Sequence, residues 1–189
     1  MDFDAILDVH RQVVDHIEHQ LEEPILAGAR LLVDCLHGGG KILICGNGGS
    51  ACDAQHIAGE LVNRFLLDSR PYAALALTVD AAVLTSCGND YGFDQVYERQ
   101  VQALGQEGDL LIAISTSGNS ENVLRACHAA QEIGLKRIGL LGGTGGKIAG
   151  QVDLPITIAC TSEVPRIQEG HLIILHALCE IVEESLEKK

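Results

Sequence analysis

Two apolar runs, each followed by a loop of small polar residues and then by a helical pattern, place the strongest constraint on the fold of this chain. Residues 41–45 read KILIC and lead into GNGGS at 46–50, while residues 109–114 read DLLIAI and lead into STSGNS at 115–120. Uninterrupted β-prone runs of this kind are typical of strands that are buried on both faces of a parallel sheet. The sequence therefore predicts two units of strand, loop and helix.

The rest of the chain continues this alternation. Alternating strands and helices indicate an α/β fold, here a doubly wound, five-stranded parallel sheet of the flavodoxin type with flanking helices. The chain has 189 residues and no Pro/Ser-rich linker or charge block, so one domain is predicted over 1–189. Beyond the first two runs, strands are predicted near 73–77, 136–141 and 154–159, and helices near 50–66, 80–87, 92–104 and 119–133.

Helices that the sheet does not require stand at both ends of the chain. An amphipathic pattern covers residues 4–21, a second helix runs from Pro24 to the glycines at 38–40, and a long helix is predicted over 164–186. Apolar side chains of this last helix spread over more than one face, which predicts packing on two sides. We therefore expect a homo-oligomer, with the extra N-terminal helix pair at 1–38 contributing to its interface.

The net charge of −13 argues against a nucleic-acid-binding surface, which needs a basic stripe that this sequence lacks. Neutral donors and helix ends would hold a phosphate ligand, with isolated cations such as Arg64 helping at most. Seven cysteines are scattered singly without a CxxC pair, which fits a reducing cytoplasm. No signal-peptide pattern and no apolar run of membrane-spanning length is present. We expect a cytoplasmic protein without a membrane or nucleic-acid partner.

Both loops have the composition of an anion site. Two glycines and Asn47 turn the first loop toward a helix for which Ser50 is a credible N-cap, and such a turn presents free amides and the positive end of a helix dipole. In the second loop, four hydroxyls within six residues exceed what one N-cap needs, which suggests hydrogen bonds to phosphate oxygens. The first loop alone is also compatible with a plain tight turn, because it matches no nucleotide-binding fingerprint.

Polar side chains inside two helices indicate a reactive site. His56 and Glu60 are four residues apart and share one helix face, although such a pair is as often an ordinary helix pair. Both loops follow strands at the carboxyl edge of the sheet, where open α/β sheets bind ligands, and this favours a functional role. Gln168 and His176 lie eight residues apart on the last helix, which corresponds to two full turns plus a rotation of roughly 80° about the helix axis.

Taken in order along the chain, these segments resemble the phosphoheptose isomerase family, whose members have the sugar isomerase (SIS) fold. The resemblance covers nearly the whole chain, and its motifs together are highly specific. It is carried by GNGGS at 46–50, DAQHIAGEL at 53–61, Asn89-Asp90, STSGNS at 115–120, and RIQEGH at 166–171 with His176.

The resemblance implies an aldose-ketose isomerase that converts sedoheptulose 7-phosphate to D-glycero-D-manno-heptose 7-phosphate. This is the first step of ADP- or GDP-heptose biosynthesis for cell-surface polysaccharide such as lipopolysaccharide. It also implies a cytoplasmic homotetramer that binds one zinc ion per subunit. By the same resemblance, catalysis falls to Glu60 and His176, metal binding to His56, Glu60, Gln168 and His176, and substrate binding to Asn47, Gly48, Gly49, Ser50, Glu60, Asn89, Asp90, Ser115, Thr116, Ser117, Ser120 and Gln168.

The implied reaction explains the need for such residues. A ketose becomes an aldose by losing a proton from C1, passing through an enediol and gaining a proton at C2, so a base must lie beside two adjacent carbons. Glu60 suits this transfer, His176 suits the transfer between sugar oxygens, and a metal ion could stabilise the enediolate oxyanion. Because Gln168 and His176 are about 12 Å apart along a straight helix, we hypothesise that the site is completed across a subunit interface.

Two other functions stay open at this stage. One is a non-catalytic SIS-domain protein that binds a replication initiator, and the presence of both Glu60 and His176 speaks against it. The other is an isomerase of another phosphosugar, since sugar length depends on pocket shape. For His171 a structural role is at least as well supported as a direct one, and the glycine-rich stretch at 142–146 is predicted to be a simple turn.

Overall fold

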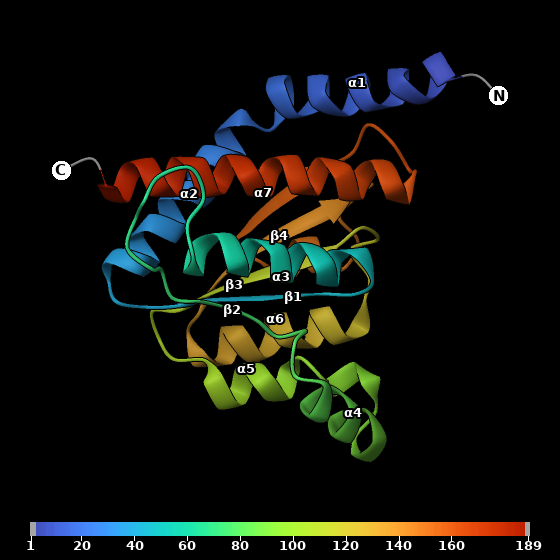
Figure 1. Ribbon diagram of the computed structural model, residues 1–189. Coiled ribbons are helices and arrows are strands. Elements are labelled where there is room, and N and C mark those ends of the chain that lie inside the picture. Colours follow the sequence, from blue (N-terminus) through green and yellow to red (C-terminus); the bar gives the residue numbers. More distant parts are fainter. Residues whose placement is uncertain (1–2, 188–189) are drawn as a thin grey trace.

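Five parallel strands form the centre of the molecule in the computed structural model, which describes residues 3–187 (Figure 1). The strand order is β2-β1-β3-β4-β5. The chain therefore passes from β1 to the edge strand β2 and then continues on the other side of β1 with β3, β4 and β5. This confirms the predicted doubly wound sheet, while residues 1, 2, 188 and 189 of the predicted domain lie outside the described part. The strands are β1 (Ile42–Gly46), β2 (Ala74–Ala76), β3 (Leu110–Ser115), β4 (Lys136–Gly142) and β5 (Leu154–Ile158).

Helices cover both faces of the sheet, and two short 3₁₀ turns complete the chain. In Figure 1, α3 and α7 lie on one side of the strands with α2, whereas α4, α5 and α6 lie on the other. The helices are α1 (Phe3–Gln20), α2 (Glu22–His37), α3 (Gly49–Val62), α4 (Ala81–Asp90), α5 (Glu98–Leu104), α6 (Glu121–Ile133) and α7 (Val164–Glu187), and the 3₁₀ turns are η1 (Phe93–Gln95) and η2 (Ile148–Gln151).

Two predicted helices differ from the observed ones. The helix expected at 92–104 is divided into η1 and α5, with Val96 and Tyr97 between them, and Gly92, with a φ of 93°, stands before η1 as its N-cap. The helix expected to run to 66 ends at Val62. There the backbone N–H groups of residues 65–67 bond to the carboxylate of Glu183 on α7 rather than to helix carbonyls. A contact distant in sequence thus sets the end of α3.

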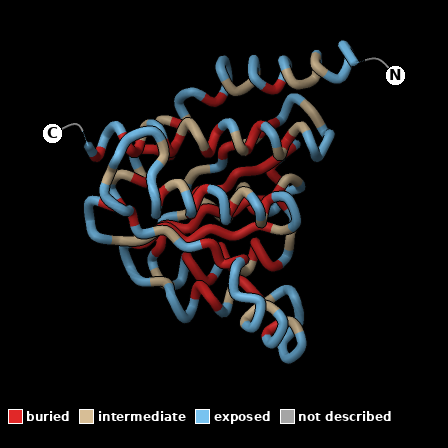
Figure 2. The backbone as a smooth tube through the Cα atoms, viewed as in Figure 1, coloured by how far each residue is buried: buried red, intermediate tan, exposed pale blue. Residues whose placement is uncertain are grey.

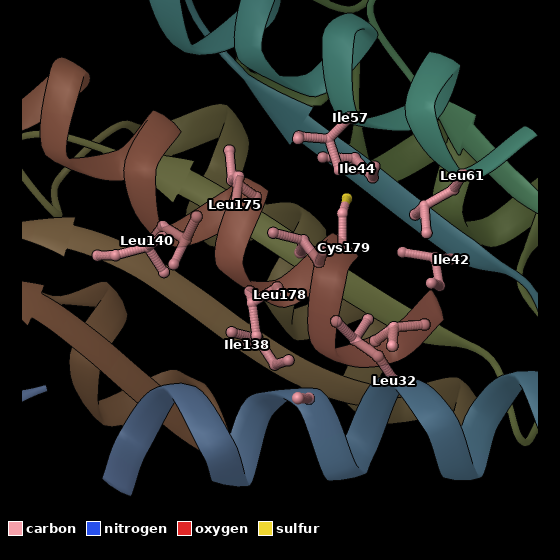
Figure 3. Close-up of a cluster of buried hydrophobic side chains, with 14 of the residues drawn as sticks. Leu32, Ile42, Ile44, Ile57, Leu61, Ile138, Leu140, Leu175, Leu178 and Cys179 are labelled. Carbon is pink, nitrogen blue, oxygen red and sulfur yellow. The ribbon is translucent and has the colours of Figure 1, made fainter. Parts of the chain in front are cut away.

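The interior consists of two apolar layers, one on each face of the sheet, and Figure 2 shows the strands as the most continuously buried part. In the layer under α3 and α7, Leu175, Leu178 and Cys179 gather with Ile57 and Ile44 (Figure 3). All five are at most 3% exposed. Burial of each large aliphatic side chain contributes about 1.5–3 kcal/mol, so this layer firmly fixes α7 against the sheet and α3.

The first helix, α1, packs mainly on α7 and also contacts the edge strand β5, and it lies above α7 in Figure 1. Three of its large apolar side chains remain exposed, namely Phe3, Ile6 and Val14. No helix in the described range 3–187 is long and apolar enough to cross a membrane.

A buried histidine ties α7 to β4. The His171 side chain is inaccessible to solvent, and its Nε2 lies 2.9 Å from the carbonyl oxygen of Leu141, to which it donates. Its Nδ1 is buried without a hydrogen-bond partner, so a second proton would be unpaired. Burial accordingly lowers the pKa of His171 to about 4 from an ordinary value of 6.5. This placement supports a structural role for His171.

His171 should make folding sensitive to mild acid. Its pKa is lower in the folded than in the unfolded state, so stability is lost as pH falls below 6.5, and the loss is complete below about pH 4. We expect a loss of about 2 kcal/mol between pH 7 and pH 5 that His171→Gln does not show. Urea denaturation of both proteins at the two pH values measures it, and equal losses would contradict the prediction.

Candidate functional site

The two predicted anion loops lie side by side at the carboxyl edge of the sheet. Gly46 of β1 pairs with Ile114 of β3, so the first loop (residues 46–50) and the second loop (residues 115–120) leave adjacent strands. They leave where the strand order reverses, which is the usual ligand site of an open α/β sheet. Both loops therefore lie at the carboxyl edge of the sheet, as predicted, and they are neighbours there.

Two residues that the sequence did not single out hold the first loop in place. The side-chain amides of Asn47 and Asn122 exchange two hydrogen bonds, of 2.8 and 2.9 Å, and Asn122 is buried in the first turn of α6. Tyr97 is also buried, and its hydroxyl donates to the carbonyl of Gly46 at 2.5 Å. Asn122 thus joins the first loop directly to the helix that follows the second loop.

The first loop needs its glycines, and Ser50 does not cap the helix. Gly48 stands at the N-cap with a φ of 59°, and α3 begins at Gly49. Ser50 lies inside the first turn because its N–H bonds to the carbonyl of Asn47 at 3.1 Å, so the predicted N-cap was wrong. A β-carbon on Gly49 would lie 2.6 Å from Nε2 of Gln168, so this glycine lets α7 approach the loop.

The second loop concentrates hydroxyl groups that the helix does not use. Ser120 is the N-cap of α6, but its side chain caps no backbone amide. Its Oγ lies 3.1 Å from Oγ of the buried Ser115, which in turn lies 3.5 Å from Oγ of Ser117. Thr116 is half-buried beside them. These hydroxyls keep free capacity for a ligand, as the composition of the loop suggested.

The glycine-rich stretch at 142–146 does more than turn the chain. The N–H of Ile148 donates to the carbonyl of Gly118 at 3.0 Å, and Lys147 N–H donates to the Asn119 side chain at 3.1 Å. A β-carbon on Gly142 would lie 2.3 Å from the carbonyl oxygen of Thr116. The segment from 142 to 148 therefore packs backbone against backbone on the second loop and supports it.

Helices α3 and α7 bring the predicted reactive side chains together. Nε2 of His56 lies 2.8 Å from Nε2 of His176, although the two residues are 120 positions apart. Oε1 of Glu60 lies 3.5 Å from the same nitrogen of His56. At 2.8 Å the two imidazoles can share a hydrogen bond, and the Glu60 carboxylate can pair with His56 when that imidazole is protonated. The group can hold and move protons, and it is partly open to solvent, with the His56 side chain 45% exposed.

Asp53, within the DAQHIAGEL segment, is a further candidate residue. It precedes His56 by three positions on α3, and its Oδ2 is buried without a hydrogen-bond partner. Burial raises the pKa of this carboxyl group, and the neighbouring His56 opposes the rise. An unpaired, perturbed carboxylate beside a site is a functional candidate in its own right.

Other predicted residues lie apart from the histidine pair. The Gln168 amide rests against Gly49 at the start of α3, whereas His56 follows seven residues later, about 10 Å along the axis. Asn89 donates to Asp90 at the exposed end of α4, and no hydrogen bond within residues 3–187 joins either of them to the loops. Asp90 instead lines a 510 Å³ hollow between β2, α4 and α5.

The side chains near His176 match zinc in kind. Two imidazole nitrogens that converge within 2.8 Å, with a carboxylate nearby, are the donor types that zinc takes. No three His, Cys, Asp or Glu side chains of the described residues are arranged as a complete metal site, however. His56, His176 and Glu60 therefore fit the metal by donor type, and the predicted role of Gln168 as a ligand stays a prediction.

Comparisons with known proteins match almost the entire chain. The SIS domain family model matches residues 7–142. A curated phosphoheptose isomerase from Geobacter sulfurreducens is 51% identical over 98% of this chain and 97% of its own length. The structure of a phosphoheptose isomerase from Neisseria gonorrhoeae has a TM-score of 0.90 at 43% identity, over 96% of this chain and 97% of that one. One from Francisella tularensis has a TM-score of 0.93 at 38% identity, over 96% of both chains.

Proposed function

We propose that this chain, which belongs to the phosphoheptose isomerase family of SIS domain proteins, interconverts sedoheptulose 7-phosphate and D-glycero-D-manno-heptose 7-phosphate. One observation carries the proposal beyond family membership. His56, Glu60 and His176 form a group on α3 and α7 that can transfer protons. His56 and Glu60 lie two to three turns along α3 from the first loop. Such an arrangement suits a sugar whose phosphate and reacting carbons are at opposite ends of the molecule.

The phosphate end of the substrate is assigned to the two loops. The hydroxyls of Ser115, Thr116, Ser117 and Ser120 would donate to phosphate oxygens, together with the dipoles of α3 and α6. This use of neutral donors agrees with the acidic balance of the chain, which carries a net charge of −13. Gln168, whose side chain lies beside Gly49, would contact the sugar.

The isomerisation itself is assigned to Glu60 and His176. The Glu60 carboxylate takes a proton from C1, and the electrons of the C–H bond form the C1=C2 bond of an enediol while O2 receives a proton from His176. Glu60 then returns its proton to C2, and His176 recovers a proton from O1 as the C1 carbonyl forms. His56, whose Nε2 lies 2.8 Å from Nε2 of His176, would help to hold the His176 imidazole in place during these transfers.

We further propose that zinc binds at His56, His176 and Glu60, with Gln168 as the predicted fourth ligand. Bound there, zinc would stabilise negative charge on the substrate oxygens. Because the same Glu60 is assigned a proton transfer, its share in metal binding must leave one carboxylate oxygen free.

We also propose a homotetramer and a place in heptose biosynthesis for this protein. Exposed Phe3, Ile6 and Val14 on α1 give the N-terminal helices an apolar face that a second subunit would cover, in agreement with the predicted homotetramer. Light scattering that gave only the chain mass of 20.1 kDa would exclude this. The product would enter ADP- or GDP-heptose biosynthesis for lipopolysaccharide or a related polysaccharide in the cytoplasm.

The experiment that tests the function offers the purified protein sedoheptulose 7-phosphate and follows aldose formation. Fructose 6-phosphate and ribulose 5-phosphate serve as alternative phosphosugars, and each is assayed after chelation and after zinc is restored. We expect conversion of the heptulose, loss of activity on chelation and recovery with zinc. Faster conversion of a shorter sugar would replace the substrate assignment, and activity that survives complete zinc removal would overturn the metal proposal.

A further inference from the structure

A buried carboxylate on α7 grips the segment that follows α3. Glu183 is only 3% exposed. Its oxygens accept hydrogen bonds from the N–H groups of Phe65 at 3.2 Å, Leu66 at 2.9 Å and Leu67 at 2.8 Å. The hydroxyl of Ser69 donates to it as well, at 3.2 Å. Four donors from one short segment therefore converge on a single side chain.

This carboxylate is held in its charged form. Burial alone would raise the pKa of Glu183, but the hydrogen bonds from the N–H groups of Leu67, Leu66 and Phe65 outweigh it and lower the pKa. Hydrogen bonds to a charged acceptor are about twice as strong as neutral ones. The backbone at 65–67 is consequently fixed, although Leu66 and Leu67 keep exposed side chains.

The gripped segment reaches the proposed reaction centre through one ring. The Phe65 ring packs against the imidazole of His176, with 5.4 Å between ring centroids. Glu183 follows His176 by seven residues, so the two side chains lie on nearly the same face of α7. The carboxylate thus pulls residue 65 onto the face of α7 that carries His176. Among the described residues, the other ring in contact with His176 is that of His56.

We propose that Glu183 is a positioning residue for the isomerisation, which sets the orientation of the His176 imidazole through the backbone and ring of Phe65. The proposal rests on the function assigned to His176 above. It adds that proton transfer depends on a carboxylate that touches neither substrate nor metal. A displacement of about 1 Å in a reacting group can cost a factor of about 100 in rate, so the loss of this grip should act mainly on kcat.

The next turn of α7 offers a matched control. The hydroxyl of Tyr72 donates to Oε1 of Glu187 at 2.7 Å, which joins the same connecting segment to the same helix through a different pair of side chains. Tyr72→Phe therefore removes one hydrogen bond between this segment and α7 and leaves Glu183 unchanged. A purely structural role for Glu183 predicts that both variants lose stability and neither loses kcat beyond its folded fraction.

The test compares Glu183→Gln, Phe65→Leu, their combination and Tyr72→Phe in steady-state kinetics with sedoheptulose 7-phosphate. For Glu183→Gln we expect kcat to fall by about 10- to 100-fold with KM within about twofold. The double variant should be no slower than the slower single variant, because both changes break one linkage. An unchanged kcat in folded Glu183→Gln, or losses that multiply in the double variant, would overturn the proposal.

Crystal structures of the same variants separate this proposal from the proposed function. In Glu183→Gln we expect the Phe65 ring to leave His176 and the imidazole to turn, with both rings unchanged in Tyr72→Phe. If native protein failed to isomerise the heptulose, the function would fall while these structures still decided whether Glu183 orients His176. Unmoved rings in Glu183→Gln would refute the positioning role in either case.

Discussion

Replacing Glu60 by Gln should lower kcat for heptulose isomerisation by about 10²- to 10⁴-fold, the range that a positioned general base contributes. The amide keeps the size and helix position of the carboxylate but cannot accept the C1 proton. KM should change little, because the phosphate is proposed to bind at the loops, about three turns away from Glu60 along α3. Steady-state kinetics with the aldose detected directly measures both constants.

Two measurements make the Glu60 result specific. Native protein in D₂O should incorporate deuterium at C2 of the product, and Glu60→Gln should incorporate none above background. Zinc content is measured on the same samples, because Glu60 is also a proposed ligand and metal loss alone would lower the rate. Glu132→Gln, which removes one exposed negative charge from α6 on the other face of the sheet, is the control for net charge. A zinc-loaded Glu60→Gln that kept a tenth of the native kcat would rule out Glu60 as the base.

The sheet and most helices could be predicted from the sequence because their signals are local. The runs at 42–46 and 110–115 are wholly buried strands, and a continuous apolar run is what such burial requires. The helix predicted from residue 92 began one residue too early, because glycine is often tolerated inside a helical pattern and the sequence does not show that Gly92 has a φ of 93°.

The assembled site depends on contacts that sequence spacing does not encode. The spacing of His56 and Glu60 predicted their shared face, but the approach of His176 to His56 follows from the packing of α7 against α3. Family resemblance, not periodicity, suggested that partnership. The end of α3 likewise depends on Glu183, more than 100 residues later.

One signal in the sequence could have revealed Glu183. Glu183 follows the buried Cys179 by four residues and the buried Val182 by one, so it lies on the buried side of α7. An acidic residue on an apolar stripe needs partners once it is buried, so this position deserved a predicted role. Asn122 gave a comparable signal, as an amide one position into a helix whose next residues are apolar.

Replacing Gly118 by Ala should be among the most destabilising single changes in the chain. A β-carbon at this position would lie 2.0 Å from the carbonyl oxygen of Gly145 and 2.3 Å from its carbonyl carbon, and backbone atoms cannot turn aside as a side chain can. Gly118 also has a φ of 65°, which costs a residue with a β-carbon about 1–2 kcal/mol. With overpacking of about 1–3 kcal/mol or more added, we expect a loss of at least about 3 kcal/mol in urea denaturation.

Gly143→Ala separates the two causes. Gly143 has nearly the same φ, 61°, but no atom lies within 4 Å of the place where its β-carbon would be, so only the backbone cost of about 1–2 kcal/mol applies. Equal losses in the two variants would show that the segment at 142–146 yields to the clash and does not brace the second loop. Where Gly118→Ala folds at low temperature, its KM should rise more than its kcat falls. The hydroxyls that this change displaces are those assigned to phosphate, whereas the groups assigned to proton transfer lie on α3 and α7. The rise in KM would then measure how far substrate binding depends on the glycine-rich stretch.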